Sequence, residues 1–372
     1  MKETIGIGII GTGFARTTQL PAFCACAGAR VVAIASGHRE NAERVAREFD
    51  IPNVAADWRA VVEHRDVDLV CITTPPVTHR EMTLAALDFN KAVLCEKPTA
   101  MNAGEAHAML ARAEEKAALA LIDHELRFLR GRQVMRDLVR AGEIGRVRHA
   151  KFTFRADSRA GADRSWDWWS DAGAGGGVLG AIGSHAVDAL RWLLDAEVTR
   201  VCAQLATHVA ERKDERTGAL RRVTTDDEAN LLVSFTDGEF TTDTTGAIAL
   251  SMVEAGQPEH SVELYGERGA LMIAEPEELY RAEVGGRTWQ RVEVLPTELA
   301  PGLRDGSWSR GFTNFANAIV AALQAGAREV AYAATFADGY RNQLVLDAAR
   351  TAHERSRWVH VNDLAAASTE RT

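Results

Sequence analysis

The first third of the chain alternates short, continuous apolar runs with segments of helical spacing. Runs that are apolar at every position predict strands buried on both faces, and such strands joined by helices predict a parallel sheet. The segments between the runs, among them 41–49 and 83–90, have the spacing of helices. We therefore expect a doubly wound α/β domain. The predicted strands are Ile5–Ile10, Val31–Ala35, Val67–Thr73, Ala92–Cys95 and Ala118–Ile122.

From about residue 127 the pattern changes and becomes rich in strands. One helix is predicted over Gln133–Ala141 and another over His185–Leu194, after a segment rich in Trp and Gly at 166–177. The turn dipeptides at 237–238 (Asp-Gly) and 285–286 (Gly-Gly) indicate antiparallel pairing. The predicted strands of this part are Val147–Arg155, Val198–Thr207, Ala229–Phe235, Glu239–Ala247, Ser261–Tyr265, Ala270–Ala274 and Gln290–Val294.

Two helices are predicted to close the chain, and the residues after Asn362 are expected to fray. The first of these helices has its apolar residues on one face, which predicts that this face packs on a core. The residues of that face are Phe312, Phe315, Ile319, Val320 and Leu323.

Composition and charge narrow the classes of function. The 372 residues are 46% hydrophobic and 26% charged, which excludes a disordered chain and allows two domains. The 43 basic and 52 acidic residues leave a net charge of −9, so we expect no nucleic-acid partner. No apolar run reaches the roughly 18 residues of a membrane span, so we expect a soluble protein without a membrane partner. The five cysteines fit a reduced cytoplasm, and their spacing predicts no metal site.

The loop after the first predicted strand has the context of a dinucleotide-binding turn. Gly11 would form the tight turn, and Gly13 would let a pyrophosphate approach the backbone at the start of the helix. Arg16 stands where the pattern has its third glycine, although the small Ala15 could allow close helix packing. The alternative is a plain glycine turn between a strand and a helix.

The end of the second predicted strand bears on the choice between NAD and NADP. An NAD site usually has an acid there for the ribose 2′-hydroxyl, whereas a cation accommodates the 2′-phosphate of NADP. This chain has Ser36 and Arg39 and no acid, which favours NADP, with NAD as the second possibility. Alternatively, Arg39 is a solvated residue that begins the following helix.

Five motifs in order along the chain resemble the Gfo/Idh/MocA family of nicotinamide-dependent oxidoreductases. Each motif is weak alone, but their order is specific. The resemblance implies an N-terminal Rossmann domain over residues 1–125 and a C-terminal α+β domain over 126–372. The second domain would have an open, mostly antiparallel sheet that often forms an oligomer interface, so we expect a homodimer or homotetramer. The motifs are Ile7–Phe14, Thr73–Pro76 with Thr78-His79, Glu96-Lys97-Pro98, His124–Phe128 with Gly142–Gly145, and Gly175–Leu179 with Gly183-Ser184-His185 and Asp188.

The resemblance also implies which loops bind the cofactor. They are the glycine loop and the loops that follow the third and fourth predicted strands, beside the end of the second strand. The expected cofactor-binding residues are Gly11, Gly13, Phe14, Ser36, Arg39, Thr73, Thr74, Pro75, His79, Glu96 and Lys97.

Lys97 and His185 are the expected catalytic residues. Oxidising a secondary alcohol requires a group that takes the hydroxyl proton as the hydride leaves, and reduction reverses this step. Lys97 follows a strand's carboxyl end, and family members place this lysine beside the nicotinamide. His185 is expected at the start of a helix with Ser184 as N-cap, where the helix dipole favours a neutral ring. A surface lysine and a buried histidine bonded to backbone are the alternatives.

One departure from the family concerns a carboxylate. Many members carry Asp four residues before the histidine, but this chain has Ala181 there. Lys97 and His185 therefore lack that partner acid. Asp188 follows His185 by three residues, so it could face the same side, or it could serve only as an acid in the first turn of the helix.

Arg127, Arg164 and Trp168 join Asp188 as candidates for substrate binding. The tryptophans of 166–169 could stack on a sugar ring or exclude water from the nicotinamide. A core or interface cluster is an equally good interpretation of these tryptophans. Arg127 could contact substrate or brace the junction between the domains.

We therefore expect an NADP(H)-preferring oxidoreductase acting on a sugar, a polyol or a related hydroxy or keto compound. One alternative is a lyase or glycosidase on the same fold, in which a retained cofactor oxidises and re-reduces the sugar. The other is a non-catalytic NAD(P)-binding regulator, which Ala181 keeps open and which Lys97 and His185 argue against. No Ser-His-Asp order, HExxH or P-loop supports hydrolysis by those routes or kinase chemistry.

Overall fold

The computed structural model describes residues 2–274 and 276–369. Its contacts divide the chain into two compact units. The first unit consists of the residues up to Met101 together with Glu105–Leu129 and Thr297–Tyr340. The second consists of Asn102–Gly104, Arg130–Pro296 and the residues from Arg341 on. The units do not follow the single expected division at residues 125 and 126, because a late segment of the chain returns to the first unit.

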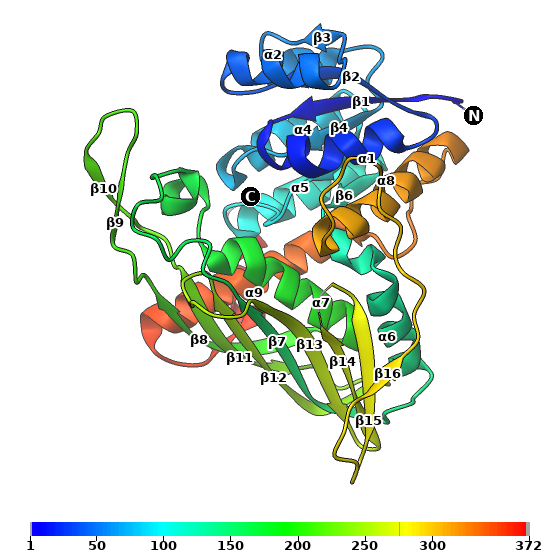
Figure 1. Cartoon of the computed structure of the whole chain (residues 1–372), viewed down its shortest axis with the longest axis vertical. Helices are drawn as coiled ribbons and strands as arrows, with labels where there is room; N and C mark the ends of the chain where they lie inside the picture. The colour runs from blue at the N-terminus through cyan, green and yellow to red at the C-terminus, as the bar shows by residue number, and fades with distance from the viewer. Residues whose placement is uncertain (1, 275, 370–372) are drawn as a thin grey trace. The chain divides into compact units, whose positions relative to one another are not determined.

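The first unit is built on a seven-stranded sheet in the order β17-β6-β5-β4-β1-β2-β3 (Figure 1). All pairs are parallel except β17 with β6. The direction of the strand order changes between β1 and β4, which is where open α/β sheets bind ligands. The predicted Rossmann arrangement is confirmed. The strands are β1 (Ile5–Ile10), β2 (Ala29–Ala35), β3 (Asn53–Val54), β4 (Leu69–Ile72), β5 (Ala92–Cys95), β6 (Ala120–Ile122) and β17 (Ala334–Thr335).

Two separate apolar clusters enclose this sheet. Ile7 of β1 belongs to a cluster with Phe23 and Phe312, whereas Ile10 belongs to the other cluster, with Met82. The strands are thus buried on both sides, as continuous apolar runs predict. The helical segments are the π-helix η1 (Ala15–Gln19), α1 (Leu20–Ala25), α2 (Arg39–Glu48), α3 (Trp58–Glu63), η2 (Pro76–Thr78), α4 (His79–Asp88), α5 (Ala103–Lys116), η3 (Glu125–Phe128) and α8 (Ser307–Ala325).

The late segment completes the core of the first unit. Phe312 and Phe315 of α8 are fully buried, which confirms the predicted apolar face of this helix. The ring of Phe312 lies 5.4 Å from that of Phe23, and the ring of Phe315 stacks at 4.4 Å on that of Phe128. Such aromatic pairs add about 0.5–1.5 kcal/mol to the burial of their apolar area. The first unit therefore depends on α8.

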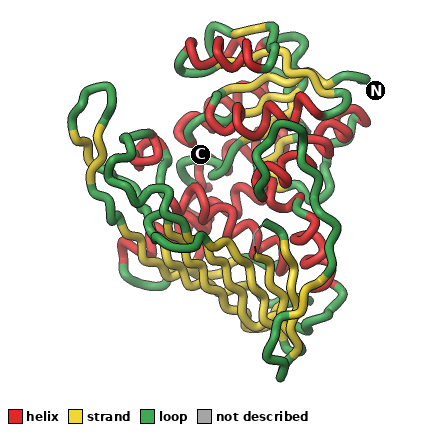
Figure 2. Tube along the Cα trace, in the orientation of Figure 1, coloured by secondary structure: helices red, strands yellow, loops and turns green. Residues whose placement is uncertain are grey.

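The second unit is built on a nine-stranded sheet in the order β16-β15-β14-β13-β7-β12-β11-β8-β18, drawn in yellow in Figure 2. Only β7 and β12 pair in parallel, so the predicted, mostly antiparallel sheet is confirmed. The strands are β7 (Val147–Arg155), β8 (Val198–Ala206), β11 (Glu228–Phe235), β12 (Thr241–Ser251), β13 (Glu259–Gly266), β14 (Gly269–Ala274), β15 (Glu278–Glu283), β16 (Gln290–Val292) and β18 (Val359–His360).

Helices cover one face of this sheet and leave the other face open (Figure 1). In β11 the burial alternates: Leu231 and Val233 are buried, whereas Asn230 and Leu232 are exposed. This two-residue period is expected of a sheet with one covered face. The helical segments are α6 (Arg130–Arg140), η4 (Trp168–Ser170), η5 (Ala172–Ala174), the π-helix η6 (Leu179–Gly183), α7 (Ser184–Leu194), α9 (Phe336–Arg355) and α10 (Val361–Thr369).

Several elements of the second unit differ from the prediction. The residues after Asn362 that the structure describes, up to Thr369, belong to α10, where a frayed end was expected. The strand β15 and a separate hairpin of β9 (Glu211–Lys213) and β10 (Leu220–Arg222) were not predicted. Charged residues interrupt the apolar pattern in these segments. In the hairpin the fully buried side chain is Arg212, whose guanidinium donates to the carbonyl oxygen of Gly161 at 2.7 Å.

Candidate active site

The glycine loop after β1 has the geometry of a ligand-binding turn. Gly11 has a φ of +105°, and a Cβ there would lie 2.5 Å from Oγ1 of Thr73 and 2.7 Å from the carbonyl oxygen of Thr73. Only glycine therefore fits where the ends of β1 and β4 meet. A Cβ on the exposed Gly13 would have nothing within 4 Å, which leaves room for a ligand beside the backbone.

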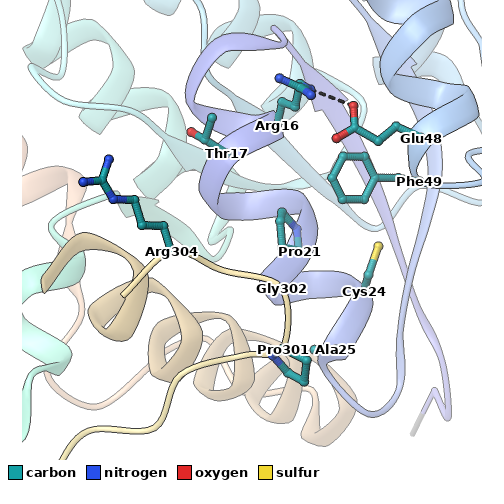
Figure 3. A pocket seen from close by; sticks show the side chains of 10 residues that line it. All are labelled: Arg16, Thr17, Pro21, Cys24, Ala25, Glu48, Phe49, Pro301, Gly302 and Arg304. Carbon is teal, nitrogen blue, oxygen red and sulfur yellow. Dashed lines mark hydrogen bonds and ion pairs between the residues drawn. The ribbon is translucent and has the colours of Figure 1, made fainter. Parts of the chain in front are cut away.

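Arg16 does not obstruct this turn. Ala15 is fully buried as the first residue of η1, so it provides the close helix packing for which the pattern uses a third glycine. The Arg16 side chain extends to α2, where its Nε donates a 2.7 Å hydrogen bond to Oε2 of Glu48 (Figure 3). The loop therefore fits a dinucleotide despite its incomplete motif.

The end of β2 lies against the glycine loop. Oγ of Ser36 is 3.4 Å from Oγ1 of Thr12. Arg39 is the first residue of α2, and its exposed side chain donates from Nε to Oε1 of Glu43 at 2.9 Å. An exposed pair of this kind is worth no more than about 1 kcal/mol, so a phosphate dianion can compete with Glu43 for Arg39.

His79 is fully buried between the loop after β4 and the loop after β5. Its Nε2 lies 2.9 Å from the carbonyl oxygen of Thr74, and its Nδ1 lies 3.1 Å from that of Pro98. Burial lowers the pKa of His79, while hydrogen bonds to backbone carbonyls oppose that shift and the charge of Lys97 adds to it. The ring thus holds two predicted cofactor loops together, and its direct contact with a cofactor stays a prediction.

Lys97 comes two residues after the end of β5, at the sheet edge where Gly11 follows β1, and its side chain is half-buried. The preceding Glu96 is 8% exposed and accepts a 3.3 Å hydrogen bond from Nε2 of Gln19. Burial raises the pKa of Glu96, and the positive charge of Lys97 opposes that rise. The Glu96 carboxyl therefore has partners within the protein, and its predicted contact with a cofactor stays a prediction.

Arg127 is buried and has partners in the late segment of the same unit. Its Nη2 lies 3.5 Å from Oδ1 of Asp338, and its Nη1 donates to the carbonyl oxygen of Tyr332 at 3.4 Å. A buried, paired guanidinium is costly to unpair. These partners give Arg127 a structural role within the first unit, and both its contact with a substrate and its bracing of the domain junction stay predictions.

In the second unit, the glycine-rich segment leads into the helix of His185 through the π-helix η6. Oδ2 of Asp226 accepts a 2.6 Å hydrogen bond from the backbone N–H of Leu179. Gly177 has a φ of +103°, and a Cβ there would lie 2.5 Å from Oδ1 of Asp226. Burial raises the pKa of Asp226, and the Leu179 hydrogen bond opposes that rise. Asp226 thus caps the helix from a distant part of the chain, which local sequence patterns do not reveal.

His185 is the second residue of α7, close to the predicted helix start, but a π-helix directly precedes this helix. The helical backbone already begins in η6, and Ser184 is the first residue of α7, without a capping bond from its side chain. The predicted N-cap role of Ser184, and the dipole argument that depends on it, are wrong. His185 and Asp188 are each 2% exposed, and Ala181 is 5% exposed in η6. Lys97 belongs to the first unit and His185 to the second, so their joint action stays a prediction.

The Trp-rich segment packs partly on the β9–β10 hairpin. The guanidinium carbon of Arg221 lies 3.3 Å from the ring centroid of Trp166, a cation–π contact. Trp168 is 36% exposed, and its ring lies 5.6 Å from that of Trp169. Arg164 is exposed and donates to the carbonyl oxygen of Ser158. Trp166 therefore has a structural role, while Trp168 and Arg164 retain accessible surface for a ligand.

A cleft of about 850 Å³ lies beside η1 and α1 in the first unit (Figure 3). The Arg16–Glu48 pair forms part of its wall, and Pro301 and Arg304 contribute from the loop before α8. Lys97, Gly11 and Gly13 do not line this cleft, so the cleft does not mark the predicted site of cofactor binding and proton transfer.

Within residues 2–274 and 276–369, no group of three or more His, Cys, Asp or Glu side chains is arranged to hold a metal ion. None of the helices in these ranges has both the length and the apolar character needed to cross a membrane.

Two family models match the chain. The model of the oxidoreductase family with an NAD-binding Rossmann fold matches residues 5–124, and that of the GFO/IDH/MocA C-terminal domain matches residues 133–272. Among curated relatives, an uncharacterized oxidoreductase of Synechocystis is 28% identical over 98% of each chain. Levoglucosan dehydrogenase of Pseudarthrobacter phenanthrenivorans is 27% identical over 98% of this chain and all of the relative.

Solved structures agree with these matches. An oxidoreductase domain protein from Kribbella flavida has a TM-score of 0.85 and 28% identity, over 96% of this chain and 99% of its own. Levoglucosan dehydrogenase in complex with NADH and L-sorbose has a TM-score of 0.84 and 26% identity, with the same coverage. Both units of the chain are therefore similar to enzymes that are named as oxidoreductases.

Proposed function

The chain belongs to the Gfo/Idh/MocA family of oxidoreductases, and from this premise we propose that it is an NADP(H)-preferring oxidoreductase of a sugar, a polyol or a related hydroxy or keto compound. The position of Lys97 carries the proposal, because this lysine follows β5 at the sheet edge that bears the glycine loop. When bound there, a nicotinamide supplies or accepts a hydride. The sugar class is supported by the relative whose structures hold levoglucosan or L-sorbose.

Lys97 would handle the substrate proton. Its half-buried ammonium can give a proton to a substrate oxygen, and its neutral amine can take one from a hydroxyl. His185 would orient the same oxygen through its buried ring. Ala181 offers no carboxylate to share this work, so we assign the proton transfer to Lys97.

The preference for NADP(H) is proposed from the end of β2. No acid directly follows this strand to bind a ribose 2′-hydroxyl, and Arg39 is exposed and forms an ion pair with Glu43. A guanidinium can bind a 2′-phosphate with two hydrogen bonds. Levoglucosan dehydrogenase, a relative, has been solved in complex with NADH. A preference of this chain for NAD(H) is therefore the alternative to test.

The test is net turnover. The purified protein is incubated with NADP⁺ or NAD⁺ and a panel of sugars and polyols, and reduction of the nicotinamide is followed by its absorbance. Substrate-dependent reduction supports the proposal. Conversion of a sugar without net reduction would favour the lyase or glycosidase with a retained cofactor. Tight cofactor binding without any conversion would favour the regulator.

We also propose a cytoplasmic homodimer or homotetramer. All five cysteines are free thiols, as a reducing compartment favours. The open face of the second sheet carries the exposed Leu232, and covering such a face lowers its cost in water. Light scattering of the purified protein would measure the oligomer, and a monomer at micromolar concentration would contradict this part of the proposal.

A further inference from the structure

Two buried carboxyl groups lie against each other in the first unit, and one of them, Glu96, directly precedes Lys97 in the chain. Asp123 is fully buried and Glu96 is 8% exposed. Nε2 of Gln19, in η1, donates to Oδ2 of Asp123 at 2.8 Å and to Oε1 of Glu96 at 3.3 Å. The two carboxyl groups also hydrogen-bond to each other. This arrangement brings together one residue from η1, one from the loop after β5 and one from the loop after β6.

A hydrogen bond between two carboxyl groups requires a proton on one of them, because an ionised carboxylate can only accept. Two charges in contact within the interior would also repel strongly. Oδ1 of Asp123 has no N–H or O–H donor among the described residues, so an ionised Asp123 would keep a charged oxygen without solvation. The pair therefore holds one proton and one negative charge.

The surroundings place the proton on Asp123. Burial raises the pKa of the Asp123 carboxyl well above its usual range, and the charges of Glu96 and Glu125 raise it further. Burial also raises the pKa of Glu96, but the charge of Lys97 and the hydrogen bond from Asp123 oppose that rise. Glu96 is thus the member of the pair that has a cation to stabilise its charge.

We propose that Asp123 is a positioning residue for Lys97: it keeps its proton at neutral pH and donates it to Glu96, so that a single negative charge lies beside the lysine. The proposal rests on the proposed function in so far as Lys97 handles the substrate proton. One negative charge stabilises the ammonium, whereas a second would hold its proton more tightly and hinder its transfer. Asp123 acts through Glu96 and needs no contact with substrate.

The other titratable groups around the pair do not supply a competing charge switch. Cys71 of β4 and Cys95 of β5 face it, and burial raises the pKa of both thiols, so they stay neutral. Glu125 of η3 adds negative charge on the side of Asp123. That charge favours the protonated form of Asp123.

The first test is the pH dependence of stability, which does not require activity. The folded chain keeps a proton on Asp123 that the unfolded chain releases above about pH 4, so this residue makes the wild type less stable as pH rises. Asp123→Asn keeps the donor to Glu96 and removes that dependence. We expect its melting temperature, relative to wild type, to increase from about pH 5 to about pH 8. A difference that stays constant or decreases would overturn the proposal.

Infrared spectroscopy of the full chain tests which residue holds the proton. At neutral pH the wild type should show the carbonyl band of a protonated carboxyl group that Asp123→Asn lacks and Glu96→Gln retains. A band that survives in Asp123→Asn and disappears in Glu96→Gln would place the proton on Glu96 and overturn the assignment. Because the difference spectra need no substrate, failure of the proposed function would leave this arm informative.

The third test is the pH profile of turnover. One limb of the pH profile reports the proton donor. In Asp123→Asn this limb should stay at its wild-type pH, whatever effect the substitution has on the rate. Glu96→Gln removes the charge beside Lys97 and should move that limb to lower pH by about one unit. A shift of that size in Asp123→Asn would mean that Asp123 is ionised in the wild type and would overturn the proposal.

Discussion

The side-chain amide of Asn342 donates a 2.7 Å hydrogen bond to the carbonyl oxygen of Ser184, the residue before His185. Asn342 is 2% exposed in α9, and Ser184 is the first residue of α7 after the π-helix η6. Both residues are buried, so this bond connects α9 to the first turn of α7 and thereby helps to fix the helix that carries His185.

Asn342→Leu should therefore destabilise the protein. The substitution leaves the buried carbonyl of Ser184 without this donor, which costs about 1–3 kcal/mol in the free energy of unfolding. Urea denaturation followed by circular dichroism measures the change. The exposed Asn362→Leu in α10 is the matched control and should change stability by less than about 0.5 kcal/mol. Equal effects of the two variants would mean that the buried hydrogen bond of Asn342 does not stabilise the protein.

The two glycines of the cofactor loop should respond differently to alanine. Gly11→Ala places a Cβ against Thr73 at a positive φ, so it should lower stability by at least about 1–3 kcal/mol. Gly13→Ala meets open space and should keep the melting temperature within a few degrees, while NADPH binds about tenfold more weakly. Differential scanning fluorimetry and calorimetric titration separate the two effects. Unchanged NADPH affinity in Gly13→Ala would show that the ligand does not approach this backbone.

Lys97→Ala should reduce turnover by a factor of about 10²–10⁴, as expected for loss of a general acid or base. Cofactor affinity should stay nearly unchanged, because the glycine loop is intact in this variant. Steady-state kinetics and a cofactor titration on the same preparation provide both readouts. Lys213→Ala, on the exposed surface of β9, is the charge-matched control and should turn over at the wild-type rate. Strong residual activity in Lys97→Ala would remove this lysine from the mechanism.

Arg39→Ala should weaken NADPH by about tenfold and leave NADH nearly unaffected, because only NADPH carries the 2′-phosphate. Glu43→Ala is the complementary variant: it frees Arg39 from its 2.9 Å ion pair and should tighten NADPH binding. Calorimetric titration with each nucleotide measures both. Equal losses for the two nucleotides in Arg39→Ala would reject its role at the phosphate.

His79 should make the protein less stable in mild acid. Burial lowers its pKa in the folded state, so the unfolded chain binds a proton that the folded chain does not. The stability contributed by the neutral ring is complete above about pH 6.5 and decreases as pH falls below that value. Denaturation of wild type and His79→Gln between about pH 5 and 7.5 tests the sign. If the stability of His79→Gln falls as steeply as that of the wild type when the pH is lowered, the effect comes from other groups.

The sequence was most informative where structure depends on local apolar patterns. Strands β5 and β7 occur with the predicted bounds, because each is a short run between clear turn signals. The turn at 237–238 does join an antiparallel pair, β11 and β12. These features follow from neighbouring residues, so a single sequence contains the information.

Long-range partners were not predictable in the same way. Asp226 caps the helix of His185 from 47 residues away, and Asn342 reaches Ser184 across 158 residues. The buried Arg212 makes a charged hairpin part of the fold through hydrogen bonds to distant carbonyls. The N-cap role of Ser184 was also wrong, because a π-helix directly precedes Ser184 and has no local signal comparable to an N-cap.

The return of residues 297–340 to the first unit determines when the nucleotide-binding unit can form during synthesis. Phe312 and Phe315 supply ring contacts to Phe23 and Phe128, and β17 pairs with β6, so the growing chain lacks these contacts until about residue 340 has left the ribosome. Most of the second unit has been made by then. The amino-terminal segment therefore lacks part of its core until then, and a fragment ending at residue 125 would expose the apolar surface that α8 covers.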